Sequence, residues 1–162
     1  MILEKYIESL ANQEKLIRIK KPISKELEIA GVLKSLEPTP VLFDNVSDSK
    51  FRVAGNLFCT KGQIADYFGI KTEDIIPTLT SAIENRNEPN IVESAPCQEV
   101  IEDRVNLDTL PILLHNEIDG GPYISSGVVV SVDPEYGQNL DFHRAMQIGK
   151  DRIVTRVVRG RD

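Results

Sequence analysis

The sequence contains little of what marks fibrous, membrane-spanning or secreted chains. Its nine prolines and ten glycines among 162 residues are too few for a collagen-like or low-complexity protein. No apolar run approaches the roughly 20 residues that a membrane helix requires. The first fifteen residues mix acidic and basic side chains where a secretory signal would be apolar. With a hydrophobic share of 41% and a charged share of 27%, the chain is predicted to be a folded, soluble, cytoplasmic protein.

Cysteine is scarce as well. Cys59 and Cys97 lie far apart and form no C-x-x-C pattern, which argues against a zinc knuckle and against a redox pair. A chain of this length can bury a core without disulfide or metal staples. The pattern therefore predicts two reduced, mostly buried thiols.

Positive charge is sparse except at one end. The chain has 19 basic and 25 acidic residues, and its net charge of -6 argues against a surface built mainly for nucleic acid. Residues 144–162 hold six basic and two acidic residues, which gives this segment +4 and leaves the preceding residues at -10. We therefore expect an anionic ligand near the carboxyl-terminal end.

The amino-terminal segment alternates helical and extended patterns. Apolar residues over 2–10 recur at helical spacing, and LIRIK at 16–20 alternates as an edge strand would. Ser24 is expected to cap a second helix whose apolar stripe runs from Leu27 to Leu36. A helix, a strand and a second helix are therefore predicted in this order.

The same alternation continues along the chain. The segments VLFDNV at 41–46 and FRVAGN at 51–56 are expected to be extended, and Thr60 and Thr72 each precede a short helix. Mixed strands and helices in this order predict a small α/β layer, which we assign to residues 1–90.

The character of the sequence changes after this layer. Residues 91–111 are predicted to form a linker, and residues 112–162 to form the first strands of an antiparallel β-barrel. Extended patterns separated by short turns occupy residues 123–132, 139–149 and 152–158. Because a meander of three strands has two open edges, the barrel is expected to be incomplete within this chain.

The second of these strands is dense in polar side chains. Strict alternation places Asn139, Asp141 and His143 on one face, and Phe142 and Arg144 on the other. Asn139 and Arg144 therefore cannot serve one pocket unless a bulge or bend intervenes. An edge strand with one solvated face is the competing interpretation.

Three other features invite a functional interpretation. The glycine-rich stretch Ile118–Ile124 is typical of a turn. Arg159 and Arg161 could bind a phosphate with their planar guanidinium groups, or lie solvated at a strand end. His115 has no acid or nucleophile at a telling spacing, so a structural role is expected.

Four motifs, in order, resemble the UbiD family of decarboxylases. They are APCQEV at 95–100, LPIL at 110–113, DGGPYISSGVVVSVDPEYG at 119–137 and NLDFHRAMQIGKDR at 139–152. The resemblance is clear from about residue 90 onward and looser before it. It implies a cytoplasmic, homo-oligomeric enzyme that holds prenylated flavin mononucleotide (prenyl-FMN) in a split β-barrel similar to that of flavin reductases. The implied fold class is therefore α/β, with a small α/β layer followed by the start of this barrel.

The resemblance also implies roles for individual residues. Asn139 takes the position of a metal-binding asparagine, which holds manganese against the flavin phosphate; potassium is a further expected ion. Arg144 takes the position of the catalytic arginine, which engages the substrate carboxylate. Asp141, Phe142 and His143 fall where the family lines the flavin, so all three are expected to bind the cofactor together with Arg144 and Asn139.

The last residues extend this comparison. Arg161 is expected to bind the cofactor. Asp162 stands eighteen residues after Arg144, where many members place a metal-binding histidine, and an aspartate can also ligate a hard cation. The family's two catalytic glutamates and its metal-binding glutamate would lie beyond Asp162. The chain is therefore expected to be an amino-terminal portion that is inactive alone and acts with the rest of the same enzyme.

The sequence leaves several functions open. The leading expectation is non-oxidative decarboxylation of a small α,β-unsaturated acid, such as the trans-anhydromevalonate 5-phosphate of archaeal isoprenoid synthesis. A 4-hydroxybenzoate-type acid of quinone synthesis is the runner-up. Two further candidates are a non-catalytic flavin-binding or assembly subunit and a flavin reductase that uses ordinary FMN.

Overall fold

A computed structural model describes residues 2–85, 87 and 89–157. The chain forms two compact units. The first consists of Met1–Ile17, Glu37–Val41 and Ala54–Arg104, and the second of Arg18–Leu36, Leu42–Val53 and Val105–Asp162. Each unit is thus assembled from segments that are distant in the sequence.

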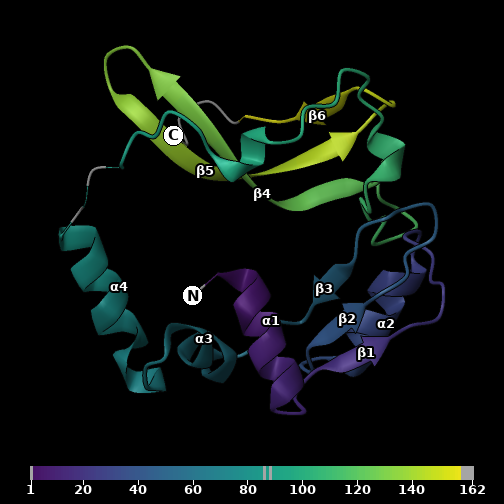
Figure 1. The fold of residues 1–162 in the computed structure, drawn as a ribbon, viewed down its shortest axis with the longest axis horizontal. Coiled ribbons are helices and arrows are strands. Elements are labelled where there is room, and N and C mark those ends of the chain that lie inside the picture. Colours follow the sequence, from purple (N-terminus) through teal and green to yellow (C-terminus); the bar gives the residue numbers. More distant parts are fainter. Residues whose placement is uncertain (1, 86, 88, 158–162) are drawn as a thin grey trace. The chain divides into compact units, whose positions relative to one another are not determined.

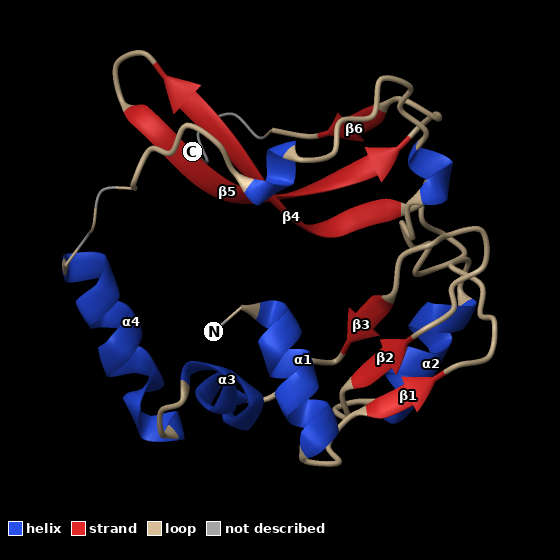
Figure 2. Cartoon of the chain, viewed as in Figure 1, coloured by secondary structure: helices blue, strands red, loops and turns tan. Residues whose placement is uncertain are grey.

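The helices and strands follow the predicted order (Figure 2). The helices are α1 (Leu3–Asn12), α2 (Glu28–Leu36), α3 (Lys61–Phe68) and α4 (Ile75–Glu84), with 3-10 turns at Thr72–Asp74, Pro96–Gln98 and Leu107–Thr109. The strands are β1 (Ile17–Ile19), β2 (Val41–Phe43), β3 (Val53–Gly55), β4 (Tyr123–Asp133), β5 (Gly137–Gln147) and β6 (Ile153–Thr155). They form two sheets in the orders β1-β2-β3 and β4-β5-β6, which confirms the predicted edge position of β1. Among the described residues, no helix is both long enough and apolar enough to span a membrane.

Aromatic packing anchors α1 within the first unit. Tyr6 is 1% exposed, and its ring stacks on Phe58 at a centroid distance of 5.8 Å and meets Tyr67 edge-on at 5.2 Å. The Tyr6 hydroxyl donates to the carbonyl oxygen of Gln63 at 3.1 Å. Stacked and edge-on ring pairs of this kind add to the stabilisation that burial alone provides. The amino-terminal helix is therefore tied to α3 and to the loop before it.

α3 begins directly after Thr60, as predicted, and Thr60 caps it. The Thr60 hydroxyl accepts from the backbone N–H of Gln63, and the Gln63 side chain accepts in return from the N–H of Thr60 at 2.8 Å. This reciprocal capping box satisfies two donors that the first helical turn leaves unpaired. At the other end, Gly69 adopts a φ of +68°, the left-handed conformation that commonly ends a helix.

The second helix begins later than the sequence indicates. α2 starts at Glu28, and Leu27 lies before it with a φ of +64°. The Leu27 N–H donates to the carbonyl oxygen of Leu114 at 2.9 Å, so this stretch of backbone pairs with a distant segment. The Ser24 hydroxyl accepts from the N–H of Glu26 and does not cap α2. The predicted cap and helix start are therefore wrong, because a long-range backbone pairing outweighs the local signal.

The segment before β4 links the α2 region of the second unit to the meander. Leu113 pairs antiparallel with Tyr123, and Leu114 pairs parallel with Glu26. Ile112 and Leu113 are buried. A short apolar segment with backbone partners on both sides therefore fixes where β4 begins.

Strands β4, β5 and β6 form the predicted antiparallel meander (Figure 1). The β4–β5 turn is closed by Asp133, whose carboxylate accepts from the N–H groups of Glu135 and Tyr136 at 2.8 and 2.9 Å. These two donors hold the pKa of Asp133 below its usual range. Gly137 then enters β5 with a φ of +83°, which explains the glycine at this position.

One face of the meander is apolar and exposed. The register places Val128 opposite Phe142 and Val130 opposite Leu140. These four side chains are between 50% and 75% exposed. A contiguous apolar face of this kind is typical of a surface that packs against another polypeptide segment. The described strands form an open sheet, so closure into a barrel stays a prediction.

Both cysteines are free, as predicted, but both are exposed. Cys59 lies in the loop before α3, where its thiol approaches Oδ1 of Asn56 at 3.7 Å. Cys97 lies in the 3-10 turn Pro96–Gln98, in which no residue is buried. The predicted burial is wrong because both residues fall in surface connections outside the apolar core.

Candidate functional site

The pairing of β5 with β4 determines which side chains share a face. Asn139 pairs with Ser131, and His143 pairs with Gly127. Asp141 lies between these positions on the same face, whereas Phe142 lies on the other face, opposite Val128. The predicted alternation along this strand is therefore confirmed.

A β-bulge lies directly opposite Arg144. Ile124 pairs with Ala145, and Gly127 pairs with His143, so two β4 residues stand against Arg144 alone. These two residues are Ser125 and Ser126. A bulge or bend is what Asn139 and Arg144 would need to serve one pocket, and the structure has a bulge on the partner strand, opposite Arg144. Bulges bend the chain locally and often lie next to active sites, where they direct a side chain.

The pairing of β6 with β5 ends at Ala145, next to Arg144. Among the described residues, β6 pairs only with residues 145–147, so no described strand covers the edge of β5 from Arg144 towards the hairpin turn. The Thr155 hydroxyl donates to the carbonyl oxygen of Arg144 at 3.0 Å. This bond ties Arg144, the first β5 residue outside the β6 pairing, to the end of β6.

A cavity of about 940 Å³ lies at this open edge. Its lining consists of His115, Asp119, Tyr123, Ser125, Asp141, Phe142, His143, Arg144, Met146, Val154, Thr155 and Arg156. All of these residues belong to the second unit. No strand in the described part of the chain covers the edge of β5 here, and residues from both of its faces border the same space.

The predicted site residues divide into three groups. Asp141, Phe142, His143 and Arg144 line the cavity. Asn139 lies two residues before Asp141 in β5 and is not part of the lining. The expected cofactor residue Arg161 and the expected metal ligand Asp162 lie outside the described residues.

The cavity brings together a carboxylate, an imidazole and a guanidinium group. Asp141 and His143 form a pair, with 2.8 Å between Oδ2 of the carboxylate and Nε2 of the imidazole. In the described part of the chain, the Arg144 guanidinium forms no hydrogen bond or ion pair. A free, permanently charged and planar group at a cavity wall is suited to bind a carboxylate in a bidentate manner.

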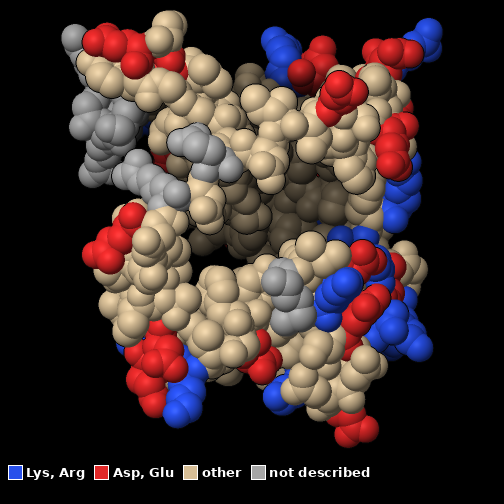
Figure 3. All heavy atoms as spheres, turned by 60° about the vertical axis from the view of Figure 1, so that its left-hand side comes forward, with Lys and Arg blue, Asp and Glu red and all other residues tan. Residues whose placement is uncertain are grey.

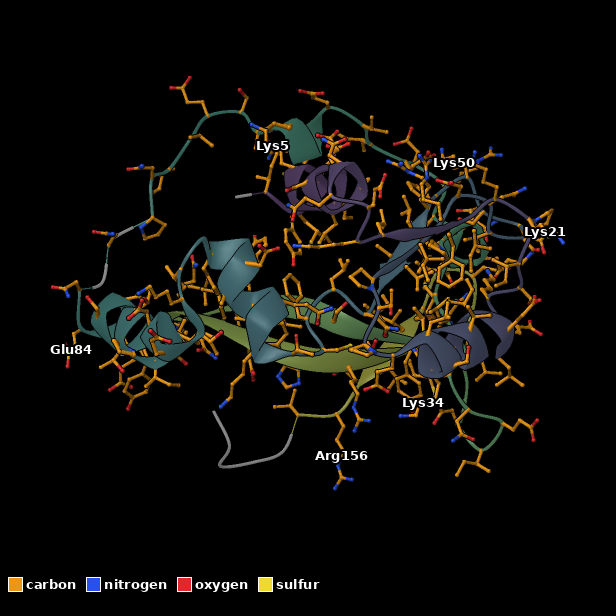
Figure 4. The ribbon with its side chains drawn as sticks, turned by 90° about the horizontal axis from the view of Figure 1, so that it is seen from below. Lys5, Lys21, Lys34, Lys50, Glu84 and Arg156 are labelled. Carbon is orange, nitrogen blue, oxygen red and sulfur yellow. The ribbon has the colours of Figure 1, made fainter. Side chains whose placement is uncertain are left out.

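Several polar groups of this site were not predicted from the sequence, among them His115, Ser125 and Arg156. His115 lines the cavity, whereas only a structural role was expected for it. Ser125 reaches the site because of the bulge, and Arg156 because of the β5–β6 pairing. The only sequence signal for any of them was the basic carboxyl-terminal segment that includes Arg156. Figure 4 shows the Arg156 side chain extending away from the ribbon, just after β6.

Neighbouring segments pack closely against the end of β5. A Cβ on Gly120 would lie 3.1 Å from Sδ of Met146, and one on Gly121 would lie 3.4 Å from the carbonyl oxygen of Gln147. The Gln147 side chain also donates to the Asp108 carboxylate at 2.8 Å. The glycine-rich stretch is thus a close backbone approach that supports the site, as well as a turn.

The described residues offer a weak donor set for a metal ion. No group of three or more His, Cys, Asp or Glu side chains in the described ranges could hold one. Of the two predicted ligands, only Asn139 is described, and its amide oxygen is a suitable but single hard ligand. Figure 3 shows acidic and basic side chains in small mixed groups on the face in view, with no large patch of one sign.

The cavity does fit a phosphorylated aromatic cofactor. Its volume lies within the range of about 300–1,000 Å³ that is usual for ligand sites. Two guanidinium groups, from Arg144 and Arg156, can meet anionic oxygens, and the Phe142 ring offers an aromatic surface. Tyr123 and Ser125 supply hydroxyl groups for hydrogen bonds.

Two family sequence profiles match nearly the whole chain. The 3-octaprenyl-4-hydroxybenzoate carboxy-lyase N-terminal domain (UbiD_N) matches residues 7–83. The 3-octaprenyl-4-hydroxybenzoate carboxy-lyase Rift-related domain (UbiD) matches residues 90–162.

Individual relatives agree with the profiles. The anhydromevalonate phosphate decarboxylase of Methanosarcina mazei is 39% identical over 158 residues, which cover 98% of this chain and 36% of the relative. The enzyme of the same name from Methanocaldococcus jannaschii is 34% identical over 139 residues, or 85% of this chain and 32% of that relative. The chain thus spans about a third of the length of these relatives.

The fold also agrees with a solved structure. The UbiD-class enzyme HmfF from Pelotomaculum thermopropionicum, in an evolved dimeric form in complex with prFMN, superposes with a TM-score of 0.89. It is 28% identical, and the match covers 97% of this chain and 38% of that one. The same enzyme has also been solved in complex with FMN.

The hydrogen bond from Thr155 to Arg144 is testable. Thr155→Val keeps the shape of the side chain but removes the donor, and we expect a loss of about 1 kcal/mol in the free energy of unfolding. Urea denaturation measures this value, and Thr155→Ser, which keeps the hydroxyl, is the matched control. Equal stability of the Val and Ser variants would contradict a role for this bond.

Proposed function

Because the chain belongs to the UbiD family, we propose that it forms the amino-terminal part of a prenyl-FMN-dependent decarboxylase. The proposed substrate is a small α,β-unsaturated acid, with trans-anhydromevalonate 5-phosphate as the leading candidate. Two decarboxylases named for this substrate, at 39% and 34% identity, support the choice. The observation that carries the proposal is the guanidinium of Arg144, which has no partner among the described residues, at the wall of a cavity of cofactor size.

The described residues can bind and orient the reactants. Arg144 holds the substrate carboxylate through its planar fork and fixes the direction of the bond that breaks. Arg156 adds a second permanent positive charge, which suits a phosphate group of the cofactor or the substrate. When bound, prenyl-FMN supplies the electron sink for decarboxylation. The protein's contribution is therefore orientation and electrostatic complementarity.

A metal ion is part of the proposal, although the described donor set is small. Asn139 would contribute one oxygen ligand to Mn²⁺ beside the flavin phosphate, and Asp162 would contribute a second. A potassium ion and a contact from Arg161 to the cofactor complete the proposed site. These assignments depend on the family resemblance and on the preference of such ions for hard oxygen ligands.

The organisation of the whole protein is likewise proposed. We assign residues 1–90 to an α/β subdomain, 91–111 to a linker and 112–162 to the first strands of a split β-barrel. The exposed apolar face of the meander supports the proposal that a further segment packs against it and continues this barrel. The enzyme is proposed to be a cytoplasmic homo-oligomer, and the 162-residue chain is expected to be inactive on its own.

A 4-hydroxybenzoate-type aromatic acid is the second candidate substrate. It is supported by the description of the matching profiles and by a phenolic acid decarboxylase of Sedimentibacter hydroxybenzoicus that is 32% identical over 166 residues. Offering both acids to the longer enzyme and measuring carbon dioxide release distinguishes the two. Release from neither acid would favour a non-catalytic flavin-binding or assembly role.

The role of Arg144 can be tested in the longer enzyme loaded with prenyl-FMN. Arg144→Ala removes the carboxylate partner, and we expect carbon dioxide release to fall about a hundred- to a thousandfold. Arg144→Lys keeps the charge without the planar fork, so an intermediate rate is expected. Arg152→Ala is the matched control, because this side chain is 73% exposed in the β5–β6 connection and lies outside the cavity lining. Undiminished turnover of Arg144→Ala would contradict the assignment.

The proposed metal ligand calls for a different readout. Asn139→Ala removes an oxygen donor, and we expect bound manganese and retained flavin to decrease together. Elemental analysis and flavin absorbance of the purified protein measure the two quantities. Asn139→Asp keeps an oxygen at the same position and should retain more metal than the Ala variant. An unchanged manganese content in Asn139→Ala would exclude the ligand role.

A further inference from the structure

Asp141 and His143 form a side-chain pair that the strand geometry itself creates. Residues two apart in a β-strand project from the same face, so the two side chains are neighbours along β5. Oδ2 of Asp141 lies 2.8 Å from Nε2 of His143. Both residues line the cavity, and His143 immediately precedes Arg144.

The pair leaves one ring nitrogen available. An ionised carboxylate only accepts hydrogen bonds, so the nitrogen that faces Asp141 is the one that carries a hydrogen. In the described part of the chain, Nδ1 of His143 has no hydrogen-bond partner. No buried side-chain nitrogen or oxygen among the described residues lacks a partner. Nδ1 is therefore accessible, although His143 is only 21% exposed as a side chain.

The strand opposite leaves room beside this ring. Gly127 faces His143 across the β4–β5 ladder and has no side chain of its own. A Cβ at Gly127 would lie 3.3 Å from Cγ2 of Ile124 and 3.5 Å from the carbonyl oxygen of His143. A residue with a side chain would therefore crowd Ile124 and the backbone of His143, whereas glycine is accommodated here.

We propose that Asp141 is a positioning residue that orients the His143 ring, so that Nδ1 accepts a hydrogen bond from an N–H or O–H group of the bound flavin. This inference rests on the proposed function and deepens it, because it assigns separate roles to two residues of the cofactor site. Asp141 acts through the hydrogen bond it accepts, and His143 acts through direct contact with the ligand.

The binding of FMN to the longer enzyme tests the pair. His143→Leu removes the acceptor, and we expect the FMN dissociation constant to rise roughly three- to tenfold, as the loss of one hydrogen bond predicts. His143→Asn can place an amide oxygen near the position of Nδ1 and should bind within about twofold of the wild type. Fluorescence quenching measures both values. An unchanged dissociation constant for His143→Leu would overturn the contact with the flavin.

Two Asp141 variants separate orientation from charge. Asp141→Asn keeps an oxygen that can accept from Nε2, so FMN affinity should stay near that of the wild type. Asp141→Leu is of similar size but removes the acceptor, and it should weaken binding about as much as His143→Leu does. If Asp141→Asn weakens binding as strongly as Asp141→Leu, charge and not orientation is responsible, and the proposal is wrong.

A second readout does not depend on FMN. Nitrogen-15 NMR of labelled histidine rings reports which nitrogen carries the hydrogen, and the His143 signals are those lost in His143→Gln. In spectra of the neutral ring, we expect the hydrogen on Nε2 in the wild type and in Asp141→Asn, and on both nitrogens in exchange in Asp141→Leu. A hydrogen on Nδ1 in the wild type would overturn the proposal. Failure of the wild-type enzyme to bind FMN would instead contradict the proposed cofactor, while the ring spectrum would still decide the role of Asp141.

Discussion

The register between β4 and β5 is the constraint on which the site depends. It places polar side chains of β5 on defined faces, and it puts the bulge of Ser125 and Ser126 opposite Arg144. Because side chains alternate with a period of two, a shift by one residue would move every group to the opposite face. The turn at Asp133 and the pairing of Leu113 with Tyr123 fix the two ends of this ladder.

The short length of β6 gives the site its second property. Since β6 covers only residues 145–147, the rest of that β5 edge is open in the part of the chain that the structure describes, and the cavity lies where the cover ends. An open edge exposes backbone groups and side chains of both faces to one ligand. The meander therefore combines an apolar face, suited to packing, with a polar edge that is suited to binding.

Much of this organisation follows from local sequence patterns, and the exceptions have physical causes. The meander, the helix after Thr60 and the alternation around Asp141 were predictable, since turn chemistry and periodicity act over a few residues. The start of α2 was not, because the Leu27 backbone bonds to the distant Leu114. The place of His115 at the cavity was equally hidden, because it depends on how the segment before β4 is held against β5.

The central claim is that the open edge of β5 is the flavin site. Hydrogen–deuterium exchange of the longer enzyme, with and without FMN, tests this claim directly. The account predicts that amides over residues 137–147 and at the end of β6 exchange more slowly when FMN is bound. Bound FMN that leaves exchange in these strands unchanged, while it slows exchange elsewhere, would contradict the claim.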